Sequence, residues 1–277
     1  MVTIVGDIGH GGPDPGCVVD GVREADYQLP IGLFWQEQLI QRYDVNVILT
    51  RDSDRSVDPT YTGDRRDLWR ELRARCSIAN RIQADLLFSK HHNASPNPTV
   101  RGGELYVYGA PDWAVATETN HKAPRSYAIA KRMAPILQAF LASWGIPFRG
   151  IRVAAFDVLE YTKGPAVLCE PFYATNPQDL TIAMKSEFQQ GLVETYVQMV
   201  AVGLGLKERQ PGPFSDVPAD HWAAGMLASA KAIGVTAGYP DGTFGLGKPL
   251  TREEGAAMAV RSFQAAIAHI CDKKGDQ

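Results

Sequence analysis

The chain opens with the stretch Val2-Thr3-Ile4-Val5-Gly6-Asp7-Ile8-Gly9-His10-Gly11-Gly12. An apolar, β-branched run followed directly by a glycine-rich turn is typical of a buried strand that ends at a loop. Glycine lets the backbone approach other groups closely, and His10 stands among these glycines. The stretch therefore predicts a strand whose carboxyl end presents a histidine.

Short β-rich runs alternate with longer amphipathic stretches over the first 206 residues. This alternation predicts an α/β fold with a largely parallel mixed sheet between helices. In such open sheets, functional groups gather at the carboxyl ends of the strands. We expect strands at 2–7, 45–50, 85–91, 103–108 and 166–172. We expect helices at 26–42, 64–82, 125–143 and 180–204.

A charged stretch rich in proline and glycine, Lys-Glu-Arg-Gln-Pro-Gly-Pro, occupies 207–213. It predicts a linker between a domain at 1–206 and a module at 214–270. In the module, apolar residues recur at helical spacing from Trp222 to Ile233 and from Ala256 to Ile270, on either side of a turn-rich loop. We expect a small helix-loop-helix with two apolar faces and, at about 60 residues, a marginal core.

The composition excludes several classes of protein. The net charge of −3 over 277 residues gives no general attraction to nucleic acid or to anionic membranes. No apolar run approaches the length of about 20 residues that a membrane helix needs, so we expect no membrane insertion. The first residues contain no basic leader and no signal-peptide core, which predicts that this chain carries no export signal unless a leader has been removed. The four cysteines are far apart and are expected to be free thiols.

Four titratable residues stand at positions that favour chemistry. His10 follows the first strand, Glu24 begins the first helix, His91 ends the third expected strand, and Glu170 lies inside an apolar run. Two histidines and a carboxylate form a catalytic zinc set that leaves a position for water. A carboxylate in an apolar run is costly unless it is paired or bound to metal. The spacing is not a compact motif, and Glu24 alone is also compatible with a first-turn glutamate that faces the helix dipole.

Six separated segments resemble the zinc-dependent N-acetylmuramoyl-L-alanine amidases of the amidase-3 type. They are 7–12, Glu24, Thr50-Arg51, Arg75 with Ala79-Asn80, 89–93 and 165–176. The resemblance implies that His10, Glu24 and His91 bind zinc and that Glu170 is the catalytic acid and base. Asn93 and Arg75 are expected to contact the substrate.

The adjacent histidines His91 and His92 cannot both face the metal, because successive side chains of a strand point to opposite faces. The family pattern Ser-x-His-x-Asn selects His91 and leaves His92 pointing toward the helix layer or solvent. A ligand histidine usually has its second ring nitrogen held by an acceptor, and Asp7 is a candidate for that role.

The resemblance implies hydrolysis of the amide between N-acetylmuramic acid and L-alanine in peptidoglycan, with a zinc-bound water as nucleophile and Glu170 moving the proton. Two alternatives are a zinc peptidase that cuts stem-peptide bonds and an inactive wall-binding protein. The presence of His10, His91, Glu24 and Glu170 argues against the inactive protein.

Two segments depart from the family pattern. The stretch between Arg51 and Arg75 is long, which predicts either a substrate-facing flap or a longer loop before a helix. The stretch from Tyr108 to Ser126 is short and lacks room for an occluding helical insertion, which predicts an open site.

The module resembles a single S-layer homology (SLH) repeat through 214–217, His221-Trp222, the loop 238–244 and 251–254. The resemblance implies binding of a secondary cell-wall polysaccharide, with Asp216, Trp222 and Arg252 as contacts. The residues alone leave open that Trp222 is a core anchor and that Arg252 pairs with Glu253. With no export signal, the whole resembles a phage endolysin that stays in the host cytoplasm until release and then acts at the cell wall; an autolysin is the alternative.

Overall fold

The computed structural model describes the backbone at 1–110, 114–209 and 212–275, and the side chains among these up to residue 265. The chain divides into two compact units, Met1–Lys207 and Glu208–Gln277. Residues 210 and 211 of the predicted linker lie outside the described residues.

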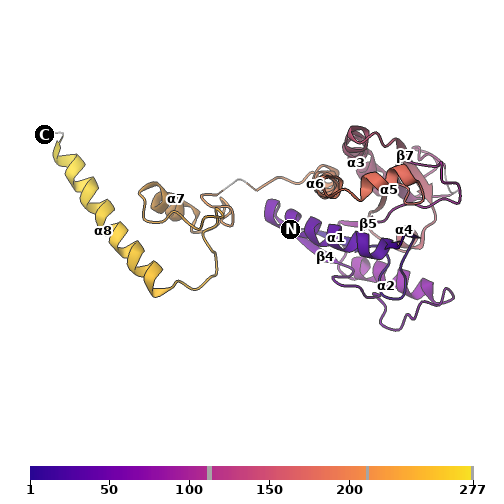
Figure 1. Ribbon diagram of the computed structural model, residues 1–277, viewed down its shortest axis with the longest axis horizontal. Coiled ribbons are helices and arrows are strands. Elements are labelled where there is room, and N and C mark those ends of the chain that lie inside the picture. The colour runs from indigo at the N-terminus through magenta and orange to yellow at the C-terminus, as the bar shows by residue number, and fades with distance from the viewer. Residues whose placement is uncertain (111–113, 210–211, 276–277) are drawn as a thin grey trace. The chain divides into compact units, whose positions relative to one another are not determined.

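The first unit is built on a six-stranded sheet with the order β4-β1-β5-β8-β6-β7. Neighbouring strands run parallel except β6 and β8, which are antiparallel. The expected largely parallel mixed sheet is therefore confirmed (Figure 1). The strands are β1 (Val2–Ile8), β4 (Val45–Leu49), β5 (Leu86–Lys90), β6 (Gly103–Tyr108), β7 (Phe148–Ala154) and β8 (Ala166–Glu170).

Helices cover both faces of this sheet. On one face lie α1 (Glu24–Arg42), α3 (Pro124–Ser143) and α6 (Ser186–Leu204), which pack over the larger apolar core. On the other lie α2 (Leu68–Arg81) and the short α4 (Asp157–Glu160). Strand β1 serves both cores, because Ile4 is buried in the first and Val5 in the second. This explains why its sequence is a continuous apolar run.

Besides the short helix α4, several elements differ from the sequence-based expectation. The helix expected at 180–204 is two helices, α5 (Pro177–Ala183) and α6. The Ala183 carbonyl at this break accepts hydrogen bonds from Tyr27 and Gln189, which replace its partner in a continuous helix. Strand β7 was not expected, because arginines interrupt its apolar pattern. A small hairpin of β2 (Val18–Val19) and β3 (Val22–Arg23) also precedes α1.

The second unit contains α7 (Ala224–Ala232) and α8 (Arg252–Gly275), so the expected helix-loop-helix is present. Its buried apolar core consists of Phe214, Val217 and Ala224, with a few half-buried neighbours. The core is small, as expected for a module of this length, and several residues of the two expected apolar faces are exposed. Trp222 is 81% exposed, Ile233 61% and Phe263 69%, because no other element of the unit packs over them within the described part of the chain.

Two further expectations concern the described residues. Cys17, Cys76 and Cys169 are free thiols, and the side chain of Cys271 lies outside the described residues. None of the described helices has both the length and the apolar character needed to cross a bilayer.

Candidate active site

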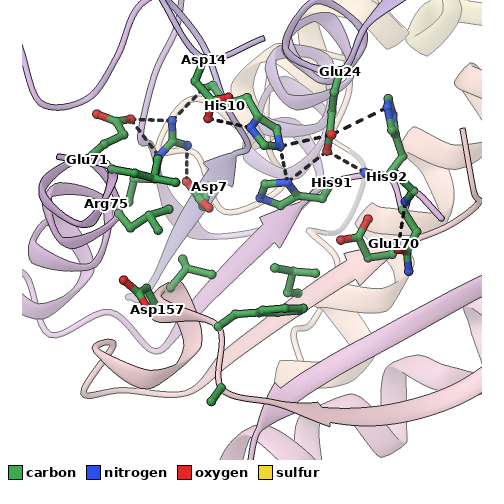
Figure 2. Close-up of a pocket in the computed structure, with 18 residues that line it drawn as sticks. Asp7, His10, Asp14, Glu24, Glu71, Arg75, His91, His92, Asp157 and Glu170 are labelled. Carbon is green, nitrogen blue, oxygen red and sulfur yellow. Dashed lines mark hydrogen bonds and ion pairs between the residues drawn. The ribbon is translucent and has the colours of Figure 1, made fainter. Parts of the chain in front are cut away.

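Three adjacent parallel strands bring their carboxyl ends to one cavity. His10 follows β1, His91 follows β5 and Glu170 ends β8, while Glu24 is the first residue of α1. All four side chains line a cavity of about 440 Å³ (Figure 2). Residues from four separate parts of the sequence thus meet at the carboxyl edge of the sheet, where sites form in sheets of this kind.

The two histidines and Glu24 converge on one point. Nδ1 of His91 lies 3.1 Å from Nε2 of His10 and 3.1 Å from Oε1 of Glu24. Nε2 of His10 lies 3.2 Å from Oε2 of Glu24. One nitrogen or oxygen from each residue falls within 4.8 Å of the others. This donor set fits zinc, which binds imidazole nitrogen and carboxylate oxygen and in catalytic sites uses three protein ligands.

The glycine-rich sequence makes this convergence sterically feasible. A Cβ atom on Gly9 would lie 2.3 Å from the His91 ring, and one on Gly16 would lie 2.6 Å from the His10 ring. His10 itself adopts a positive φ of 60°, which is uncommon for a residue other than glycine. The turn is therefore shaped around the two imidazoles.

Further contacts fix the orientation of these three side chains. Each carboxylate oxygen of Glu24 accepts a backbone N–H, one from Cys17 and one from His92. Nδ1 of His10 lies 2.8 Å from an Asp14 carboxylate oxygen, which leaves Nε2 to face Glu24. Burial alone would lower the pKa of His10, but the hydrogen bonds to Asp14 and Glu24 outweigh burial and raise it to about 10.

Sequence reasoning named Asp7 as a candidate acceptor for the second ring nitrogen of a ligand histidine. In the structure, Asp14 lies at the second ring nitrogen of His10. Asp7 accepts hydrogen bonds from Thr50, Ser89 and Arg75 instead of an imidazole. Spacing contained a signal for Asp14, since it stands four residues after His10 on the same turn.

His92 points away from the converging groups and into the helix layer. Its ring packs against Tyr27 of α1 and Phe172, with centroid distances of 5.6 Å and 5.0 Å. Burial lowers the pKa of His92 to about 4, so this imidazole is neutral at physiological pH. Its Nε2 lies 3.8 Å from Glu24, too far for a hydrogen bond, so the contact that holds the carboxylate is the backbone N–H of His92.

Arg75 lines the same cavity, but internal partners occupy its guanidinium. It pairs with Asp7 at 2.9 Å and Glu71 at 2.7 Å, and it donates to the carbonyls of Ile8 and His10. All three charged side chains are buried. The contact with substrate predicted for Arg75 stays a prediction; the structure shows a residue that holds the His10 turn against α2.

Glu170 has a different environment from Glu24. Its Oε2 is buried and has no hydrogen-bond partner among the described residues. Burial, reinforced by the nearby negative charge of Glu24, holds the pKa of Glu170 well above its ordinary value. At Glu24, burial would also raise the pKa, but the hydrogen bonds and charges of His10 and His91 hold it well below the ordinary value. The two glutamates therefore differ in acidity.

Another buried carboxylate, that of Glu104, lies on the strand next to Glu170 in the sheet. Glu104 of β6 is the register partner of Glu170 and accepts hydrogen bonds from Asn93, Tyr106 and Tyr173. It also pairs with Arg149 of β7 at 2.7 Å, which accounts for the arginines in that strand. Asn93, predicted to contact substrate, lines the cavity while its amide nitrogen is held by Glu104. Sequence reasoning missed Glu104, although it lies inside an expected strand of otherwise apolar and aromatic residues.

Comparison with known proteins agrees with this geometry. Residues 4–202 match the family described as N-acetylmuramoyl-L-alanine amidase, Amidase_3. The chain belongs to this amidase family. Residues 213–256 match the S-layer homology domain. We therefore refer to the amidase domain and the SLH domain.

Relatives and solved structures share the amidase domain. An endolysin of Bacillus phage SPP1 is 33% identical over 206 residues, which is 74% of this chain and 67% of that protein. The amidase LytC of Bacillus subtilis is 32% identical over 177 residues, which is 64% of this chain and 30% of LytC. The structure of the amidase AmiC2 of Nostoc punctiforme is similar with a TM-score of 0.60 and 30% identity, over 74% of this chain and 97% of that one.

The long segment between Arg51 and Arg75 is a loop that leads into the first turns of α2, and the loop is anchored to its surroundings. Backbone N–H groups of Val57 and Asp58 donate to Glu71 of α2, and Asp54 accepts the N–H of Gly12. These contacts favour the longer loop over the flap. In the segment 109–123, the described residues form no helix, and the open site stays a prediction.

The three residues of the SLH domain that were predicted to contact polysaccharide differ in their surroundings. Asp216 accepts three backbone N–H groups, from Phe244, Gly245 and Leu246, and so holds the turn-rich loop. Trp222 is largely exposed, so it is not a core anchor. Arg252 is exposed at the start of α8. The cavity of this domain, about 380 Å³ between the loop and α8, is lined by other described residues.

Proposed function

We propose that the amidase domain is a zinc-dependent N-acetylmuramoyl-L-alanine amidase that cleaves the amide between N-acetylmuramic acid and L-alanine in peptidoglycan. The observation that carries this proposal is the arrangement of His10, Glu24 and His91 around one point, beside a buried and unpartnered oxygen of Glu170 in the described structure. The family match supports the reaction class.

His10, Glu24 and His91 would hold the ion. Zinc, when bound, lowers the pKa of water toward about 7 and polarises a carbonyl group. Asp14 fixes the ring of His10, and the N–H groups of Cys17 and His92 fix the carboxylate of Glu24. The ligand set is thus oriented before substrate arrives.

Glu170 moves the proton. As water attacks the amide carbon, Glu170 accepts the proton that the water loses. When the C–N bond breaks, Glu170 donates this proton to the departing amine of L-alanine. A raised pKa suits a carboxyl group to both steps, since it must be a base strong enough to take a proton and an acid strong enough to return it.

The products identify the bond that is cut. We would digest purified peptidoglycan with the zinc-loaded protein and analyse the products by mass spectrometry. Intact stem peptides with a free L-alanine amine are the expected products. Shortened peptides would assign a peptidase, and an absence of products would assign an inactive wall-binding protein.

We further propose that the SLH domain binds a polysaccharide attached to the wall, so that the protein acts at the cell wall as an endolysin or autolysin does. The match to the S-layer homology domain and the exposed indole of Trp222 support this role. Trp222→Ala is expected to weaken sedimentation with intact walls, while Met226→Ala, also exposed, serves as the matched control. Equal binding of both variants and the wild type would remove Trp222 from the contact surface.

A further inference from the structure

An exposed arginine of α2 lies against two aromatic rings. The guanidinium of Arg73 lies 4.3 Å from the ring centroid of Tyr161 and 5.3 Å from that of Trp69. Tyr161 is 40% exposed and Trp69 is 47% exposed. The side chain of Asn80 donates to the Tyr161 carbonyl at 2.8 Å, which fastens this residue to α2. Contact with aromatic faces orients a guanidinium and leaves its N–H groups able to bind other molecules.

Arg73 differs from the arginines that precede it, because it has no carboxylate partner. Arg66 pairs with Asp64 at 2.6 Å. Arg70 lies 3.8 Å from Asp67. In the part of the chain that the structure describes, no carboxylate lies at ion-pair distance from Arg73. An oriented guanidinium without an ion pair fits an added carboxylate, which its planar fork can bind through two N–H groups.

The arginine adjoins the cavity of the amidase domain. Leu72, its neighbour in α2, lines that cavity. Asp157 and Val158 of α4 line it as well, and Tyr161 directly follows α4. Helices α2 and α4 pack against each other, so Arg73 and Tyr161 continue the wall that these helices form. A substrate that leaves the cavity along this wall reaches the guanidinium of Arg73.

The charges of the cavity indicate which part of a substrate Arg73 would bind. The lining includes several acidic side chains, among them Asp14, Glu24 and Glu170. Arg75, which also lines it, is already held by two buried carboxylates. A negative group of the substrate is therefore better placed outside the cavity. A stem peptide is joined to the sugar through the amine of L-alanine, so its opposite end carries a carboxylate, whereas the acetylated sugar is neutral while the amide is intact.

We propose that Arg73, oriented by Tyr161 and Trp69, binds a carboxylate of the stem peptide while the amide bond lies in the cavity. The protein then favours peptides with free carboxylates over peptides in which they are amidated. This inference rests on the amidase function proposed above. It also gives a role to the long segment between Arg51 and Arg75, which contains both Trp69 and Arg73.

Two forms of a soluble disaccharide-peptide fragment test the proposal, one with free carboxylates and one with the carboxylates converted to amides. For the zinc-loaded wild type, the KM of the amidated form is expected to be about fivefold higher. Arg73→Gln should raise the KM of the free form to that of the amidated form. Arg81→Gln removes the same charge from an exposed position in the last turn of α2, and it should keep the fivefold ratio.

Titration of both fragments into the Glu170→Gln protein measures binding without turnover and should give the same ratios. Equal affinities of the Glu170→Gln protein for the two forms would overturn the proposal, and so would a ratio that persists when Arg73→Gln is added. Equal affinities together with Arg73-dependent binding of a soluble glycerol phosphate polymer would assign the arginine to phosphate instead. If the wild type cleaves neither fragment, the amidase function is rejected, while the titration still decides whether Arg73 binds the carboxylate.

Discussion

The amidase domain and the SLH domain use side chains in opposite ways. The amidase domain buries both its apolar residues and a set of charged ones, including Asp7, Glu24 and Arg75. The SLH domain buries a few apolar residues and exposes several large ones. Groups that must be held within tenths of an ångström require packed and hydrogen-bonded surroundings, whereas a small domain with a minimal core leaves its apolar residues available to partners.

The largest effect should come from removing a metal ligand in the well-packed domain. His91→Ala is expected to lose zinc and activity together, because two ligands do not make a catalytic zinc site. His92→Ala should retain zinc, since its backbone N–H still holds Glu24, and should lose about 1–3 kcal/mol of stability from its packing. Elemental analysis of both purified variants measures this. A His92 variant without zinc beside a His91 variant with zinc would reverse the assignment.

The buried charges provide the next test. Arg75→Met leaves Asp7 and Glu71 buried without their cation, and should lower the free energy of unfolding by about 3–5 kcal/mol. Urea denaturation followed by tryptophan fluorescence measures the loss. Arg70→Met, on the exposed side of the same helix, is the control and should change little. A small effect at Arg75 would show that the network does not hold the His10 turn.

Sequence and structure agree best for β1, β5 and β8. Helices cover both faces of these strands, so their sequences are continuous apolar runs that are easy to recognise. The converging site was also predictable, because strand ends and a family pattern placed His10, His91 and Glu170 at one edge. Strand β7 was missed because Arg149 and Arg152 serve the buried Glu104, a long-range pairing that no local pattern contains. In the SLH domain, periodicity predicted the apolar faces but not their exposure, because the spacing of apolar residues does not say whether another element packs over them.

A matched pair of substitutions sharpens the contrast between the domains. Ile31 of α1 is 3% exposed, and Ile31→Ala should cost about 2–5 kcal/mol because it leaves a cavity in the packed core. Ile233 in the SLH domain is mostly exposed, so Ile233→Ala should change stability by less than about 0.5 kcal/mol. Thermal unfolding of both variants compares them directly. A loss at Ile233 as large as that at Ile31 would mean that this residue is covered in the native protein.

A smaller effect is expected at Asp216, which holds the SLH loop by hydrogen bonds. Burial would raise the pKa of Asp216, but the N–H groups of Phe244, Leu246 and Gly245 outweigh it and lower the pKa below 3.8. Its contribution to stability is therefore full above about pH 4 and is lost as the pH falls through the lowered pKa. Asp216→Asn should cost about 1–3 kcal/mol at neutral pH and remove this acid dependence. Cleavage of soluble peptidoglycan fragments should be unaffected; a loss of that activity would couple the two domains.

The central claim is that Glu170 moves a proton while His10, Glu24 and His91 hold the metal. Zinc content and turnover measured together on Glu170→Gln test it most directly, with Glu187→Gln on the exposed first turn of α6 as the control. The account predicts zinc near one per chain in both variants, near-normal turnover in Glu187→Gln, and a fall of about 10²-fold or more in Glu170→Gln. Near wild-type turnover by the zinc-loaded Glu170→Gln protein would contradict the account, and so would a loss of zinc from that variant.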